Sequence, residues 1–320
     1  MKKTAFLLIV ILAFGTGLFK PGAFAAKEMN AENGKYSETI QWVDITAKQI
    51  RIMRAAENLP KEKRNRILAD SIFAPYITVW NGYLGDETAF LNWLNNTAYN
   101  ELDEYERKLE LICTKEMQNI FFEAVEDFQE FSGYSPQGKW FVFFGPKWTN
   151  LGGLGDGTML IDMASYANTS LEKITRLFAH EINHQVYKIT SPPRENAVLY
   201  RILDEGFACY VSYLYHQGKT TIARELLYSE AAYQACREND ARIIELLREH
   251  YQSNDNQLSR LFANRQHRFF DDLPGAIGYY IGFRIVEEYV KRHGADSWKD
   301  IYTMKPEEVL RKSEIFYLHQ

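Results

Sequence analysis

Apolar residues recur every three or four positions through most of residues 37–133, as they do at Leu102, Tyr105, Leu109 and Ile112. This spacing is typical of amphipathic helices, which present apolar side chains to the core about once per turn. No internal repeat and no low-complexity linker interrupts the pattern. We therefore expect residues 26–135 to form a helical N-terminal region.

The pattern changes at Lys139. A short apolar run, Trp140-Phe141-Val142-Phe143-Phe144, ends at a Gly-Pro pair and is typical of a buried strand. Residues 158–163 predict a second strand, and the glycine-rich residues 152–157 predict a flexible turn before it. These glycines are not a phosphate-binding loop, because they lie between two strands rather than ahead of a helix.

Helical spacing returns after the second strand. One helix should begin near residues 168–170 and run to about Ile189, where Ser191-Pro192-Pro193 stops it. Further helices are expected over roughly residues 195–216 and 274–292. The pattern thus predicts an α+β fold that is mostly helical, in which residues 136–320 form one domain with a small sheet that follows the helical N-terminal region.

The first 25 residues have a different character. Lys2 and Lys3 precede an apolar run over residues 5–19, and Ala23-Phe24-Ala25 follows as a small-x-small cleavage pattern. This order is typical of a secretory signal peptide, so we expect an exported protein, whether secreted, periplasmic or at the cell surface. An uncleaved segment would instead be an N-terminal membrane anchor. No cysteine lies near the cleavage pattern, so a lipoprotein anchor is not expected.

Composition narrows the choice of partners. The 46% hydrophobic and 25% charged residues are ordinary for a globular protein, and a formal charge of −5 gives no reason to expect nucleic-acid binding. The three cysteines, Cys113, Cys209 and Cys236, are too few and too scattered for a disulfide framework. One bridge with a free thiol and three reduced, buried thiols both remain open.

The segment His180-Glu181-Ile182-Asn183-His184 carries the candidate chemistry. Two histidines four residues apart project from the same face of a helix, where their imidazoles can bind one zinc ion. Glu181 is placed to act as general base on a metal-bound water. Apolar residues surround the motif, and buried polar groups without partners cost about 1–3 kcal/mol each, so a metal would explain their presence. Two surface histidines around an ordinary glutamate are the alternative.

A third ligand is expected on the next helix. Glu205 lies 21 positions after His184, and a helix, a proline-containing turn and a second helix would bring it back to the first. A catalytic zinc ion commonly has three protein ligands and keeps a fourth position for water. Asp204, next to Glu205, could orient His180 or His184 through a hydrogen bond.

The HExxH motif followed by Asp204-Glu205-Gly206-Phe207-Ala208 resembles the gluzincin metallopeptidases. The membrane alanyl aminopeptidases of that class carry a similar Asn-Glu-Gly-Phe-Ala on the second helix. The resemblance implies a zincin-like domain in which His180, His184 and Glu205 bind Zn2+ and Glu181 is the general base. Asp204 replaces the asparagine and no Gly-Ala-Met-Glu-Asn loop is present, so aminopeptidase specificity is not implied.

A closer resemblance is to a bacterial family of predicted zinc-dependent proteases of unknown function. That family also has a downstream Glu-Gly and a late Gly-Tyr-x-x-Gly helix, which stands here as Gly278-Tyr279-Tyr280-Ile281-Gly282. Gluzincins commonly use a Tyr or His to donate to the oxyanion, which makes Tyr279 the candidate and Tyr280 its substitute. Alternatively, the two glycines simply allow close helix packing.

Two further expectations concern the surroundings of the site. In this class an exposed strand before the active helix pairs with the substrate backbone, a role that residues 158–163 could take unless they form an ordinary buried strand. The remaining histidines have no ligand-like spacing and are expected to be structural or on the surface; they are His216, His250, His267, His293 and His319.

Together these features predict an exported zinc-dependent peptidase acting on a peptide or protein substrate. Zinc would polarise the water and the scissile carbonyl, and Glu181 would move the proton from the water to the leaving amine. Two alternatives remain: an exported binding protein without catalytic activity that keeps the fold, and a zinc hydrolase of substrates other than peptides.

Overall fold

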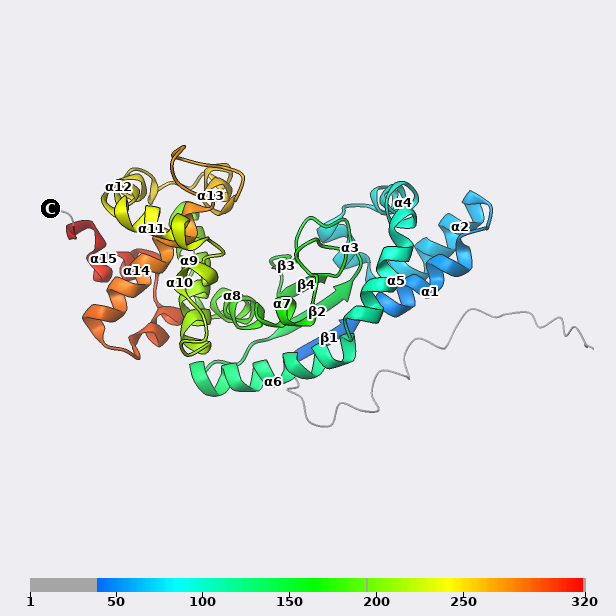
Figure 1. The fold of residues 1–320 in the computed structure, drawn as a ribbon, viewed down its shortest axis with the longest axis horizontal. Coiled ribbons are helices and arrows are strands. Elements are labelled where there is room, and N and C mark those ends of the chain that lie inside the picture. Colours follow the sequence, from blue (N-terminus) through cyan, green and yellow to red (C-terminus); the bar gives the residue numbers. More distant parts are fainter. Residues whose placement is uncertain (1–38, 194, 319–320) are drawn as a thin grey trace, which may run out of the picture. The chain divides into compact units, whose positions relative to one another are not determined.

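A four-stranded mixed sheet organises the chain (Figure 1). The strands lie in the order β1-β2-β4-β3, with β1 and β4 parallel to the central β2 and β3 antiparallel to β4. Their bounds are β1 Ile40–Asp44, β2 Gly138–Phe143, β3 Leu151–Gly153 and β4 Thr158–Asp162. The two strands expected from the apolar runs are therefore present at the centre of the sheet.

The computed structural model describes residues 39–193 and 195–318, all within one unit of the chain, Ser37–Gln320. The expected signal peptide and the alternative anchor, both within residues 1–25, lie outside the described residues, as does His319. Over the part that is described, no helix is both long and apolar enough to cross a membrane.

Six helices precede or flank the central strands: α1 Thr46–Ala56, α2 Lys61–Leu68, α3 Ile77–Tyr83, α4 Glu87–Asn96, α5 Leu102–Leu111 and α6 Thr114–Ser132. The middle of the chain contributes α7 Leu171–Thr175, α8 Phe178–Thr190 and α9 Ala197–Tyr215. The last part contributes α10 Ile222–Glu225, α11 Glu230–Glu238, α12 Asp240–His250, α13 Asn256–Ala263, α14 Ile277–His293 and α15 Pro306–Ser313. The prediction of a mostly helical α+β fold is confirmed.

The expectation of an entirely helical N-terminal region is wrong at β1. Five residues, too few for a helical period to be recognised, pair in parallel with β2 nearly one hundred positions later, from Ile40 opposite Gly138 to Asp44 opposite Val142. The side chain of Gln49, in the first turn of α1, also reaches the residue that follows β2. Its Nε2 donates to the Phe144 carbonyl over 2.8 Å, and its Oε1 accepts from the Phe144 amide over 3.0 Å. The first helix is therefore fastened to the sheet.

Both faces of β2 are covered, which explains its unbroken apolar sequence. On one face, the rings of Phe141 and Phe143 meet the Trp80 ring at centroid distances of 6.5 and 5.2 Å. On the other face, Trp140 meets Phe121 of α6 at 4.6 Å and Phe178 of α8 at 5.8 Å. Because neighbouring side chains of a strand point to opposite faces, one run of aromatic residues packs against two helical layers.

The helix expected from about residue 168 to Ile189 is interrupted. The Ser170 side chain caps α7 by accepting from the Lys173 amide over 3.3 Å, and the Leu177 amide then donates to the Ile174 carbonyl three positions back. This tighter turn separates α7 from α8. The sequence does not reveal the break, because apolar residues keep a helical spacing throughout residues 171–190. The predicted glycine turn also contains a short strand, β3, formed by pairing with β4.

Helices α9 and α14 lie side by side and form an extensive contact (Figure 1). A side-chain carbon at Gly206 would lie 2.1 Å from the Gly282 carbonyl carbon, and one at Gly282 would lie 1.9 Å from the Ile202 carbonyl oxygen. Only glycine permits backbones to approach so closely. The close-packing explanation for Gly282 is therefore confirmed, and this approach brings the N-terminal turn of α14 next to Glu205.

Candidate metal centre

The structure brings His180, His184 and Glu205 together. One ligand atom from each lies within 4.8 Å of the others. The Nε2 atoms of the two histidines are 3.1 Å apart, and Glu205 Oε2 lies 3.3 Å from His184 Nε2 and 3.9 Å from His180 Nε2. Zinc binds nitrogen and oxygen donors at about 2.0–2.2 Å in a tetrahedron, which places its ligands roughly 3.3–3.6 Å apart. The three donors thus fit one zinc ion.

Two adjacent helices, α8 and α9, build this group. The histidines occupy successive turns of one face of α8, while Glu205 lies in the middle of α9, which packs along α8. Gln185 fastens α8 to the sheet: its Oε1 accepts from Trp140 Nε1 over 3.1 Å, and its Nε2 donates to the Gly157 carbonyl over 3.0 Å. The metal-binding face is therefore held against a rigid core.

Asp204 pairs with His184 rather than with His180. Asp204 Oδ1 lies 2.8 Å from His184 Nδ1, so the imidazole donates at Nδ1 and leaves the Nε2 lone pair directed at the other donors. Burial alone would lower the pKa of His184, but Asp204 and Glu205 hold it well above its ordinary value, so a metal ion would have to displace a proton from Nε2 before this lone pair becomes available. The sequence had left the partner of Asp204 open, and the distance between these two atoms decides it.

His180 has a different neighbour, Cys209, which the sequence prediction missed. Cys209 Sγ lies 3.9 Å from His180 Nδ1 and 3.3 Å from the Glu225 carbonyl oxygen, to which the thiol can donate. Burial, together with the adjacent His184, lowers the pKa of His180 to about 3. A neutral imidazole that donates at Nδ1 presents its Nε2 lone pair to a metal. Cys209 stands one helical turn after Glu205, which was the signal available in the sequence.

Glu205 and Glu181 are buried carboxyls whose pKa values are shifted in opposite directions. Burial alone would raise the pKa of Glu205, but His184 and Arg201 hold it below its ordinary value. Burial raises the pKa of Glu181 to about 7, since the attraction of His184 does not offset it and Glu205 adds repulsion. Glu181 lines the same cleft as the metal triad. It is therefore a carboxyl that can hold or release a proton near neutral pH.

Tyr279 lies at the site and Tyr280 does not. The ring of Tyr279 is parallel to the His180 ring, with an angle of 6° and a centroid distance of 6.5 Å, and its buried hydroxyl interacts with Glu205. The Tyr280 hydroxyl instead donates to the buried Asp240, away from the metal triad. Tyr280 is therefore wrong as a substitute for Tyr279.

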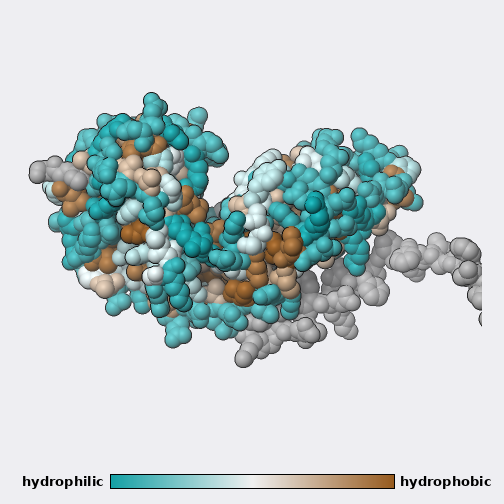
Figure 2. Space-filling view, in the orientation of Figure 1, coloured by the Kyte–Doolittle hydropathy of each residue, from teal (hydrophilic) through white to brown (hydrophobic). Residues whose placement is uncertain are grey.

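A cleft of about 1230 Å³ opens over the triad. One wall is formed by α8 and α9, and another by β3 and the glycine-rich turn after it. In Figure 2 most of the surface facing the viewer is hydrophilic, with smaller apolar patches. The expectation that residues 158–163 form an exposed strand is wrong, because β4 is paired on both sides and the edge strand beside the cleft is β3.

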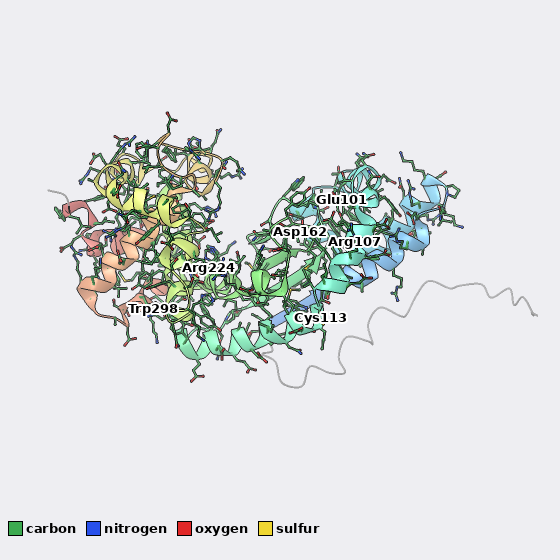
Figure 3. All side chains as sticks on the ribbon, in the orientation of Figure 1. Glu101, Arg107, Cys113, Asp162, Arg224 and Trp298 are labelled. Atoms are coloured by element: carbon green, nitrogen blue, oxygen red, sulfur yellow. The ribbon has the colours of Figure 1, made fainter. Side chains whose placement is uncertain are left out.

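The other histidines do not join the triad. His216 Nδ1 lies 3.6 Å from Glu225 in a separate polar cluster, while His250, His267 and His293 contact aromatic rings. The three cysteines are free: Cys209 and Cys236 are buried and Cys113 is exposed. No bridge links them, and the expectation that three reduced thiols would all be buried is wrong at Cys113. Figure 3 shows Cys113 near the N-terminal end of α6.

Residues 161–315 match one family model. The matched family is that of the gliding motility protein GldB. The matched stretch runs from the end of β4 through α15 and contains the whole triad. Comparisons with curated proteins and with solved structures gave no match.

The match to GldB overturns the resemblance to gluzincin metallopeptidases and to the predicted zinc-dependent proteases. The GldB family is neither a zincin nor a protease family, so the predicted peptidase function is wrong. A motif of two histidines and a glutamate on adjacent helices fixes a local geometry, and geometry of this kind recurs outside any one family. GldB is a lipoprotein family, which is consistent with an exported protein of the cell envelope.

Proposed function

We propose that this protein is a zinc-binding protein of the cell envelope whose metal is held by His180, His184 and Glu205. The single observation that carries the proposal is the convergence of their donor atoms within 4.8 Å on two packed helices. Asp204 and Cys209 support it, because each faces the Nδ1 atom of one histidine and leaves Nε2 for the metal. The α8–α9 pair would then resemble the metal-binding helices of zincins in local arrangement.

A second candidate function is hydrolysis of a substrate other than a peptide. Zinc, when bound, would supply Lewis-acid polarisation of a substrate or water oxygen. Among the residues of the chain, Glu181 could take a proton in the cleft, since burial holds its pKa near 7. The buried Tyr279 hydroxyl stays protonated and could donate a hydrogen bond there. A protein that only stores zinc needs neither of these groups beside the metal.

The cellular setting is proposed from the family match alone. The model that matches residues 161–315 is that of a gliding motility protein, so we propose that the zinc-binding protein takes part in surface motility. Deletion of the gene should then reduce spreading on agar. Complementation with the His180→Ala form separates a need for the metal centre from a need for the protein.

Metal content tests the proposal directly. Purified protein should contain near-stoichiometric zinc by mass spectrometry, and both His180→Ala and Glu205→Ala should lose it. Glu181→Gln should keep the metal, since Glu181 is not a ligand. Glu249→Ala is a matched control, because Glu249 is exposed on α12, away from the cleft.

The two candidate functions give different results in one further assay. Hydrolysis of p-nitrophenyl acetate or p-nitrophenyl phosphate by the zinc-loaded protein, lost in Glu181→Gln with its zinc intact, would support catalysis. Zinc retention without either activity would support binding alone. Undiminished zinc in Glu205→Ala would remove Glu205 from the ligand set.

A further inference from the structure

Arginine side chains surround the cleft above the metal triad. The lining includes Arg201, Arg260 and Arg265, together with Lys188 on the last turn of α8. Arg201 is neutralised by Glu205, with 3.2 Å between Nη1 and Oε1. Arg260 and Arg265 differ, because neither forms an ion pair with a carboxylate of the described residues. Both are exposed, so their charge faces the solvent of the cleft.

Four of the five acidic residues that line the cleft have partners, and the fifth, Glu181, is buried beside the triad. Asp204 accepts from His184, and Glu225 is buried among Arg176, Ser212 and Thr220 at 3.3, 2.6 and 2.7 Å. Asp156 accepts from the Thr158 amide within the glycine-rich turn. The uncompensated charge on this side of the cleft is therefore positive, and a bound metal ion would add to it.

Arg265 is held in place without losing its charge. Its Nη atoms donate to the Leu226 and Leu227 carbonyls over 3.2 and 3.4 Å, and its guanidinium lies 4.7 Å from the centre of the Tyr279 ring. A side-chain carbon at Gly275 would lie 2.2 Å from the Arg265 carbonyl oxygen, so the backbone there is closely packed as well. An arginine fixed in this way loses little further conformational freedom when it binds a ligand.

Tyr279 connects this arginine to the metal centre. The Tyr279 ring lies parallel to the His180 ring and also contacts the Arg265 guanidinium. Arg265 is therefore linked to a proposed metal ligand through a single aromatic ring. A ligand that reaches the metal with one oxygen can therefore place an anionic group near Arg265. Guanidinium groups recognise carboxylate, phosphate and sulfate oxygens through paired N–H donors.

We infer that the cleft binds a ligand with an anionic oxygen group, a carboxylate, phosphate or sulfate, through Arg265 and Arg260 beside the metal triad. This inference rests on the proposed zinc site, since the metal orients the rest of the ligand. Arg260 and Arg265 would then select the ligand by its negative charge. An uncharged ligand would gain nothing from either side chain.

Calorimetric titration of the zinc-loaded protein tests the inference, with sodium phosphate, sodium sulfate and sodium acetate as separate probes at constant ionic strength. At least one probe should bind, and its affinity should fall at least about tenfold in Arg265→Ala and in Arg260→Ala, as expected for loss of a charged hydrogen bond. Arg265→Lys should lie between wild type and Arg265→Ala. The probe that binds most tightly identifies the anionic group.

Two control variants remove the same charge elsewhere. Arg268 lies in the same segment but bonds the Asp271 carbonyl, and Arg107 lies on α5 in the N-terminal helical region (Figure 3). Neither Arg268→Ala nor Arg107→Ala should change anion affinity. Arg265 has structural contacts, so thermal unfolding of each variant is compared first. If Arg265→Ala unfolds, Arg260→Ala provides the test, because the Arg260 side chain forms no hydrogen bond or ion pair with the described residues and is exposed.

Zinc content, measured in every variant, separates this inference from the proposed function. Full zinc occupancy without binding of any probe, or with equal binding in the arginine variants and wild type, would overturn the anion site. Absence of zinc from the wild type would overturn the proposed metal centre. Arginine-dependent binding by that metal-free protein would then support an anion site independent of zinc.

Discussion

Asp204 Oδ1 and His184 Nδ1 lie 2.8 Å apart, so a carboxylate on α9 fixes the tautomer of an imidazole on α8. This bond also joins the two helices that carry the metal donors. Partners of this kind typically change metal affinity by about 10–100-fold.

The first prediction concerns this pair. Asp204→Asn should bind zinc about 10–100-fold more weakly than wild type, as measured by competition with a chromogenic chelator. The side chain keeps its size but loses the charge that favours an imidazole donating at Nδ1. Asp296→Asn, a change at an exposed aspartate outside the cleft, should leave the affinity unchanged. Equal affinity in the two variants would show that Asp204 does not support the metal.

The second prediction concerns metal removal. Zinc added to chelator-treated protein should stabilise it against unfolding by about 2.7 kcal/mol at one hundred times its Kd, because only the folded chain brings the donors together. The metal-free chain should nevertheless stay folded, since the triad stands among buried helices that pack without it. Circular dichroism during heating checks first the stabilisation by zinc and second the folded state of the metal-free chain. Loss of helical signal on chelation at room temperature would contradict the second.

The third prediction concerns pH. Zinc ligation requires neutral imidazoles at His180 and His184 and an ionised carboxylate at Glu205. Because Asp204 and Glu205 hold the pKa of His184 well above 6.5, the ordinary pKa of histidine, zinc affinity should already begin to fall at a pH above 6.5 and continue to fall below it. Calorimetry in buffers of different ionisation enthalpy should detect the protons released on binding. A zinc affinity that does not change between pH 5 and pH 8 would argue against histidine ligands.

The fourth prediction tests the close packing of α9 on α14. Gly206→Ala should destabilise the protein by about 3 kcal/mol or more, because the new carbon would lie 2.1 Å from the Gly282 backbone and the helices would have to separate. Gly152→Ala is the comparison, since its nearest neighbour is the Thr149 hydroxyl at 3.1 Å. Urea unfolding should show a much larger decrease in the free energy of unfolding for Gly206→Ala than for Gly152→Ala. Zinc affinity should fall with it, since Glu205 is the adjacent residue.

The fifth prediction tests the junction between α1 and the sheet. Gln49→Ala removes both partners of the buried Phe144 backbone, and each unsatisfied group costs about 1–3 kcal/mol. The free energy of unfolding, measured with urea, should therefore fall by roughly 2–6 kcal/mol. Gln234→Ala, at an exposed position of α11, should change the stability little. A small loss in Gln49→Ala would mean that water replaces the glutamine.

Features that depend on near neighbours in the chain could be predicted from the order of the amino acids. A four-residue separation fixes His180 and His184 on one helix face, and the apolar runs located the strands at residues 138–143 and 158–162. The sequence also placed Glu205 on a following helix. These features follow from helical and strand periodicity, which a short window of residues already contains.

Contacts between groups far apart in the chain become visible only in the folded protein. In the folded protein, Asp204 contacts His184 and Cys209 lies beside His180. Strand β1 pairs with β2, and β4 lies inside the sheet. Each of these depends on how whole elements pack, and no local period records the register between elements far apart in the chain. The motif likewise could not predict the match to the GldB model, because two adjacent helices can present this donor set in unrelated proteins.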